Sequence, residues 1–374
     1  MSTGTHPALE RADALYELRR YDEARTVLGQ RLAEDPEDVR ALVRLARCHL
    51  RLENQAEMAL EAAERALALA PEDVPALIQR AHALRAVGRF PETEGVLREV
   101  IRIDPGYWLG YAMLGDWLWR IKAYRYGRET GGRLPGGIPQ VFLDESGEFA
   151  KEAIRLAPEE VFPYEVAWLI ADMAGNRTVA DQLDQAILRL DPNHAGALAR
   201  RTEKAAAAPG VKAAEAATLY ADALAASPHS ASLQQGLDHA SYRLLRGVRW
   251  IALLSLALAG VLLDLWTKDG QVPRELPVSL GQRLWYFAPV GALWAVGALL
   301  RYRRLRTGVR YNLRSLIHRR RWPRIVLGQA AWAVLCALVI SQVPWSERTV
   351  PRIVFWVGLV PTLATIWFDR KKTT

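Results

Sequence analysis

The chain has 374 residues and a formal net charge of +8, and 51% of its residues are hydrophobic. This length exceeds one ordinary hydrophobic core, so we expect two modules. Charge separates them, because residues 1–240 carry 28 Lys and Arg against 36 Asp and Glu, whereas residues 241–374 carry 21 against 5. The two cysteines, Cys48 and Cys336, fall one in each module, which excludes a disulfide framework and favours a reducing compartment.

Residues 1–7 are predicted to be a short disordered start, without the charged-then-apolar pattern of a secretion signal. Arginine is much commoner than lysine, and alanine is abundant, a usage typical of GC-rich bacterial genomes. We therefore expect a bacterial protein.

Helix pairs are predicted from residue 8 to about residue 240, since amphipathic stretches alternate with breaks. In the third pair, residues 72–105, Leu77 and Leu84 share one helix face, and the Gly-Arg-Phe-Pro sequence that follows ends the helix, because proline cannot sit inside one. Pairs end at Pro36, Pro71, Pro105, Pro158, Pro192 and Pro228, with gaps of 35, 34, 53, 34 and 36 residues. No helix of a pair could bury its apolar stripe alone, so we expect the pairs to stack.

A period of about 34 residues is that of the tetratricopeptide repeat, and residues 8–240 resemble that family in this spacing and in the small residues that close helix packing needs. Those small residues are Ala24, Ala59, Ala66, Gly115, Ala153, Ala180, Ala216 and Ala223. The resemblance implies an all-α superhelical solenoid of about six repeats. The gap of 53 residues places a glycine-rich insertion at residues 126–140, and such an insertion is either a binding loop or a neutral excursion.

In this family the first helix of each repeat lines a concave groove that receives a peptide. The resemblance carries that role to Arg40, Arg47, Arg51, His82, Arg85, Trp119 and Arg120, with Asp13 and Tyr16 at the N-terminal end. A cationic groove would suit an extended acidic peptide, because guanidinium groups pair with carboxylates. Family members that clamp a terminal carboxylate use asparagines, and Asp13 and Arg47 stand at such positions here, which argues against a C-terminal tail as the ligand. The alternative is an ordinary solvated surface.

Four apolar segments follow, at residues 248–266, 284–300, 325–343 and 353–368. Each is near the lower limit of what crosses a membrane core of roughly 30 Å, and tryptophans lie at several of their ends, as in membrane proteins. Four buried helices of a soluble domain are the alternative. Ten arginines lie between residues 301 and 324, so the positive-inside rule predicts a multi-pass inner-membrane protein with both termini in the cytoplasm.

Residues 301–324 also carry hydrophobic side chains at helical spacing, which predicts a basic amphipathic helix against anionic lipid headgroups. The arginines assigned to that contact are Arg303, Arg304, Arg306, Arg310, Arg314, Arg319, Arg320 and Arg321. The alternative is that these arginines only set the topology. Nucleic-acid binding is not expected, because no reader fold accompanies the charge.

No catalytic, metal or cofactor site is predicted. The glycines of the insertion lack the Lys-Ser/Thr of a phosphate loop, and His229 and His239 have no third ligand. The sequence therefore predicts a non-enzymatic, membrane-anchored scaffold or adaptor that binds a protein or peptide partner. The alternative is a membrane effector or channel-like protein whose spans respond to ligand binding by the solenoid. The partner and the oligomeric state are left open.

Overall fold

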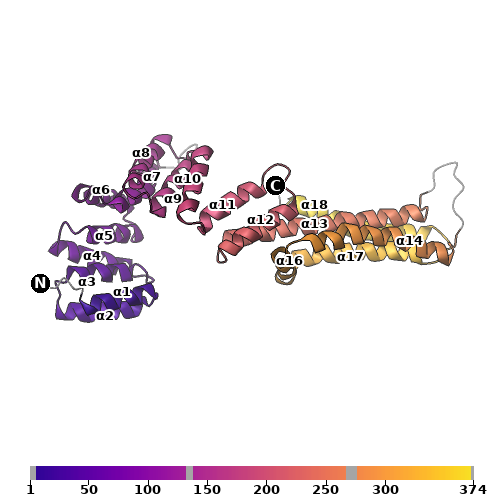
Figure 1. Cartoon of the computed structure of the whole chain (residues 1–374), viewed down its shortest axis with the longest axis horizontal. Coiled ribbons are helices and arrows are strands. Elements are labelled where there is room, and N and C mark those ends of the chain that lie inside the picture. Colours follow the sequence, from indigo (N-terminus) through magenta and orange to yellow (C-terminus); the bar gives the residue numbers. More distant parts are fainter. Residues whose placement is uncertain (1–5, 132–137, 267–275, 372–374) are drawn as a thin grey trace. The chain divides into compact units, whose positions relative to one another are not determined.

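The computed structural model describes residues 6–131, 138–266 and 276–371, and these residues form helices and turns with no strand among them. The predicted all-α class is confirmed. The chain divides into two compact units, residues 1–192 and residues 193–374, which are described separately below. Figure 1 labels their helices in chain order.

Within the described residues, the first unit consists of five successive helix pairs (Figure 1). Its helices are α1 (Pro7–Glu17), α2 (Tyr21–Glu34), α3 (Val39–His49), α4 (Ala56–Leu69), α5 (Val74–Ala86), α6 (Thr93–Ile103), α7 (Trp108–Thr130), α8 (Gln140–Leu156), α9 (Val161–Met173) and α10 (Arg177–Leu190), with a short 3₁₀ helix η1 (Phe90–Glu92) before α6. Aspartates begin α3 and α5, because the Asp38 carboxylate accepts the N–H of Ala41 at 3.0 Å and that of Asp73 accepts the N–H of Ala76 at 2.8 Å. Aspartate caps thus start the pairs that follow the breaks at Pro36 and Pro71.

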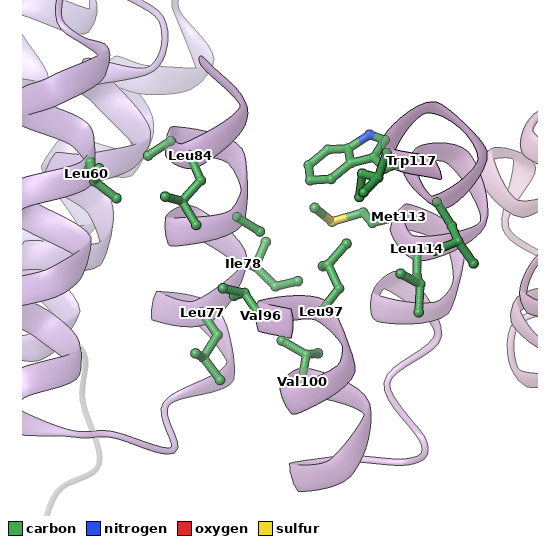
Figure 2. Packing of buried hydrophobic residues seen from close by; sticks show 14 of the residues in the cluster. Leu60, Leu77, Ile78, Leu84, Val96, Leu97, Val100, Met113, Leu114 and Trp117 are labelled. Atoms are coloured by element: carbon green, nitrogen blue, oxygen red, sulfur yellow. The ribbon is translucent and has the colours of Figure 1, made fainter. Parts of the chain in front are cut away.

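Apolar side chains from consecutive helices pack into one core, as Figure 2 shows for α5, α6 and α7. Leu84 and Leu97 are fully buried there, as the helical spacing predicts. Gly115 lies where α7 approaches α8: a Cβ at this position would stand 3.1 Å from the carbonyl oxygen of Ser146 and 3.2 Å from the amide nitrogen of Ala150. The small residue is therefore required by a close approach of two backbones.

Helix α7 is longer than the repeat pattern predicts. It continues through Thr130 and ends at Gly131, whose φ of 64° lies in the left-handed region that favours glycine. Residues 126–130 of the predicted insertion are therefore helical. Residues 132–137 lie outside the described residues.

The second unit contains the sixth helix pair and the apolar helices. Its elements are α11 (Ala195–Ala206), α12 (Ala213–Ala226), α13 (Ala231–Leu262), α14 (Leu280–Trp294), the π-helix η2 (Ala295–Leu300), α15 (Arg301–Arg304), α16 (Thr307–Arg319), α17 (Arg321–Gln342) and α18 (Thr349–Lys371). Four helical stretches are long and apolar enough to cross a membrane: Ala231–Leu262, Leu280–Arg304, Arg321–Gln342 and Thr349–Asp369. Each overlaps one of the four predicted apolar segments, although the first helix ends at Leu262, before the predicted 266, and the third ends at Gln342, before the predicted 343. Helix α13 runs without a break from the closing helix of the solenoid into the first apolar segment.

The boundary between the units follows residue 192, whereas the change of composition lies near residue 240. The difference arises because α16, from the basic segment, packs against α12 and α13. Val309 is fully buried in a cluster with Leu237. Asn312 is buried too: its Oδ1 accepts from Gln234 Nε2 at 3.0 Å, and its Nδ2 donates to Ser241 Oγ at 3.2 Å. The sixth helix pair therefore belongs structurally with the apolar helices.

Candidate partner-binding face

Most of the side chains assigned to the groove lie on the first helices of four consecutive pairs, α1, α3, α5 and α7, or just after them. Successive first helices contact each other from α1 to α5, and the rings of His82 and Trp117 join α5 to α7 with their centres 5.3 Å apart. We call the following side chains the first-helix face: Asp13, Tyr16, Arg44, Arg47, Arg51, His82, Arg85 and Trp117.

The N-terminal part of this face is a network around one carboxylate. Asp13 Oδ1 lies 2.7 Å from Arg47 Nη2, and Asp13 Oδ2 lies 2.9 Å from Arg44 Nη2. The guanidinium carbon of Arg47 also stacks 4.0 Å from the ring centre of Tyr16. Arg47 is therefore a paired cation, and Arg44, which the sequence analysis did not select, shares its carboxylate.

The central part carries two cations without a carboxylate partner in the described part of the chain. Arg51 follows α3 and donates from Nε to the Tyr16 hydroxyl at 2.8 Å. Arg85 ends α5 with its guanidinium carbon 5.0 Å from a ring centre of Trp117, and Trp117 is only 3% exposed. His82 is largely enclosed, and its burial together with nearby Arg85 and Arg51 lowers its pKa to about 4. At neutral pH the charge here therefore comes from the two arginines.

Trp119 and Arg120 are directed elsewhere. Trp119 packs against the apolar cluster of α8 and α9, and its indole lies 4.9 Å from the guanidinium of Arg120, which also pairs with Asp116 at 3.1 Å. Trp117 is instead the aromatic residue beside Arg85 of α5. The sequence pattern cannot show which of Trp117 and Trp119 lies on this face, and only the packing distinguishes them. Arg40 is exposed, at the start of α3.

The basic segment forms α15 and α16. Its predicted amphipathic pattern is present, but the apolar side of α16 faces α12 and α13. Two of its arginines pair with the same helices: Arg306 with Asp222 at 2.5 Å and Arg319 with Asp238 at 3.4 Å. Arg310 donates to the carbonyl of Leu305, and Arg314 donates to the hydroxyl of Tyr302. The exposed arginines between residues 301 and 324 without a carboxylate partner among the described residues are Arg301, Arg303, Arg304, Arg314, Arg320, Arg321 and Arg324.

A second polar cluster, not predicted, lies where α13, α17 and α18 meet. The Asp369 carboxylate, 4% exposed, accepts from Tyr242 Oη at 3.0 Å, from Trp322 Nε1 at 2.8 Å and from Arg249, which is 2% exposed. Arg246 lies 3.4 Å from the same carboxylate. A buried ion pair persists only with such additional hydrogen bonds. The cluster joins the end of α18 to α13, and in the sequence Arg249 is indistinguishable from the other basic residues that flank the apolar segments.

The described residues offer little for chemistry. No group of three or more His, Cys, Asp or Glu side chains among them could hold a metal ion. Burial raises the pKa of the Cys48 thiol to about 11, so it is not a nucleophile at neutral pH. The arrangement on the first-helix face is suited to binding.

Residues 15–57 match the family model of the tetratricopeptide repeat. No curated protein matches the chain. Similar solved structures include a MamA fragment from Desulfovibrio magneticus RS-1, at 17% identity over 51% of this chain and 99% of that one, with a TM-score of 0.36. YrrB, described as a TPR protein with an unusual peptide-binding site, is similar at 16% identity over 55% of this chain and 95% of that one, with a TM-score of 0.36. PilF of Pseudomonas aeruginosa is similar at 16% identity over 61% of this chain and 94% of that one, with a TM-score of 0.45.

The family match spans the end of α1 to the start of α4, which is one full period of the helix pairs. The N-terminal region is therefore a solenoid of the tetratricopeptide-repeat type, and it is followed by four helices that are long and apolar enough to cross a membrane.

Proposed function

We propose that this protein is a scaffold or adaptor, anchored in the bacterial inner membrane, whose solenoid binds an acidic segment of a cytoplasmic protein on the first-helix face. The observation that carries the proposal is the pair Arg51 and Arg85. Arg51 stands just after α3 and Arg85 in the last turn of α5, and neither has a carboxylate partner in the described part of the chain.

The aromatic neighbours of these arginines favour binding over plain solvation. Tyr16 accepts a hydrogen bond from Arg51, and Trp117 lies beneath the guanidinium of Arg85, so both side chains are held at the surface with donors remaining. Less conformational entropy is then lost when a ligand binds. Arginine offers five N–H donors in a fixed fork, which suits carboxylates. An extended acidic segment crossing α3 and α5 would contact both.

Membrane anchoring is supported by the four apolar helices and by the distribution of arginine. Residues 301–324 join the second and third of these helices and carry ten arginines, so the positive-inside rule puts this segment in the cytoplasm, together with both chain ends. We propose that the exposed arginines Arg303, Arg304, Arg320 and Arg321 contact anionic lipid headgroups there. Arg306 and Arg319 instead hold α16 to the protein through their carboxylate partners.

The test is binding of a fluorescein-labelled peptide of alternating Glu and Leu to the full-length protein in detergent. Arg51→Glu with Arg85→Glu should weaken binding at least tenfold, because each hydrogen bond to a charged group contributes about 1.5–3 kcal/mol and tenfold corresponds to about 1.4 kcal/mol. The matched control is Arg65→Glu, an exposed arginine on the second helix α4. A Gln-for-Glu peptide should bind weakly to all variants.

If the double variant binds the acidic peptide as tightly as the parent, the first-helix face is not the binding site. If Arg65→Glu weakens binding equally, the effect is general electrostatics and the proposal also fails. Circular dichroism of each variant confirms that the helices are retained, since charge reversal at exposed positions usually changes stability by no more than about 0.5 kcal/mol.

A further inference from the structure

A groove of about 440 Å³ lies between α13, α14 and α17. Its lining consists of Val248, Trp294, Leu327, Ala330, Ala331, Val334, Leu335 and Leu338. The one polar atom of this lining outside the backbone, Trp294 Nε1, donates to Ser255 Oγ at 3.0 Å and is therefore satisfied. The groove offers no hydrogen bond to a polar ligand and fits an apolar one.

The shape of the groove follows from small residues and from an irregular helix. Ala330 and Ala331 leave space on α17, while Trp294 closes one side. Directly after Trp294, the chain changes from α14 to the π-helix η2, a rare conformation that is frequent at functional sites. A Cβ on Gly297 would stand 2.9 Å from Ile251 Cδ1, so η2 lies close against α13.

Positive charge stands at the end of the groove next to the basic segment. Arg324 precedes Leu327 by three residues on α17 and so lies on the same side of the helix. Its Nε donates to the carbonyl of Ile317 at 2.7 Å and its Nη2 donates to the carbonyl of His318, so two neutral oxygens at the end of α16 hold this side chain. Arg301 follows Gly297 by four residues and is exposed. Neither arginine has a carboxylate partner among the described residues.

We propose that this groove binds an anionic phospholipid of the inner leaflet, with an acyl chain along Leu335, Ala331 and Leu327 and the phosphate at Arg324 and Arg301. The inference rests on the membrane anchoring in the proposed function and is independent of partner binding by the solenoid. An apolar groove with two nearby arginines that lack a carboxylate partner among the described residues matches a ligand with an apolar tail and an anionic head. Basic pockets between transmembrane helices on the cytoplasmic side bind such lipids.

The test uses the full-length protein in nanodiscs of equal parts phosphatidylglycerol and phosphatidylcholine, followed by release into mild detergent and native mass spectrometry. The parent should retain phosphatidylglycerol in preference to phosphatidylcholine. Arg301→Gln with Arg324→Gln should reduce retained phosphatidylglycerol at least fivefold, and Ala331→Trp, which fills the groove from an exposed position, should do the same. Ala331→Leu is the milder variant if the tryptophan prevents folding.

Two control variants test whether lipid retention depends on the groove itself or on any positive charge or added bulk nearby. Arg243→Gln removes an exposed arginine of α13 that lies about 140° around the helix from Val248, five residues away at about 100° each. Ala288→Trp adds bulk on α14 outside the groove lining. Both should keep phosphatidylglycerol, and glycerol phosphate in solution should not displace it.

Equal retention of the two lipids by the parent would overturn the inference. So would a loss caused by the arginine variant while both substitutions at Ala331 retain the lipid, because that result indicates headgroup attraction without an acyl site. Insertion into nanodiscs without lipid preference leaves the proposed anchoring intact. Failure to insert at all would overturn the anchoring and this inference together, and peptide binding by the solenoid would still be measurable.

Discussion

The pH dependence of stability tests how the first-helix face is built. Burial, with Arg85 and Arg51 nearby, lowers the pKa of His82 to about 4. In the unfolded chain the pKa of a histidine is about 6.5, so as the pH falls below that value the unfolded state binds a proton that the folded state does not bind. The contribution of His82 to the free energy of unfolding is therefore fully present above about pH 6.5, and it decreases as the pH falls to about 4. The difference between the two pKa values corresponds to roughly 3 kcal/mol as an upper limit.

The assay is urea unfolding of the parent and of His82→Gln near pH 7 and near pH 4. Carboxylates elsewhere titrate in both proteins, so the comparison isolates His82. We expect the parent to lose up to about 3 kcal/mol more than the variant over this interval. If both lose the same stability, His82 is protonated as easily in the folded state as in the unfolded one, and the enclosed arrangement beside Trp117 is wrong.

The same histidine can report on ligand binding. Arg85 and Arg51 oppose its protonation, so an acidic segment that pairs with both arginines would offset part of their charge and raise the pKa of His82. An NMR titration of the His82 imidazole with and without the Glu-Leu peptide would measure that rise. A peptide that binds elsewhere on the protein should leave the titration unchanged.

Two further predictions concern packing and topology. Gly95 lies on an exposed side of α6 with nothing within 4 Å of an added Cβ, so Gly95→Ala should stabilise the protein by about 1 kcal/mol through helix propensity. Gly115→Ala adds a Cβ 3.1 Å from the Ser146 carbonyl oxygen. In urea unfolding, this variant should be less stable than Gly95→Ala by about 1–3 kcal/mol. Equal stabilisation would mean that α7 and α8 are not so close. A cysteine at Glu347 should react with an impermeant maleimide added to intact cells and one at Ser315 should not; the reverse pattern would invert the proposed orientation.

The repeat architecture could be predicted because it is local. Each helix pair is encoded by an apolar stripe, a break and a cap within about 34 residues, and the small residue at Gly115 is visible as part of that period. The four apolar helices are equally local, since length and hydropathy define them.

The arrangement of side chains could be predicted only in part, because it depends on contacts between residues far apart in the sequence. The family resemblance selects Arg51 and Arg85 for the same face, but only the packing shows that Asp13 pairs with Arg47 and that Trp117 lies under Arg85. The Arg249 contact with Asp369 joins residues 120 positions apart, which no periodicity marks.

The docking of α16 has a consequence for how the protein is made. Val309 completes an apolar cluster with Leu237 that the preceding chain leaves open, and Asn312 satisfies Gln234 and Ser241. A ribosome must therefore translate two further hydrophobic segments after the sixth helix pair before that pair can finish folding. The sixth helix pair therefore completes its packing only after the first two apolar helices have been synthesised, and exposed apolar surface of this kind makes a partly folded chain prone to aggregation. A stalled nascent chain that ends before residue 307 should keep this side uncovered.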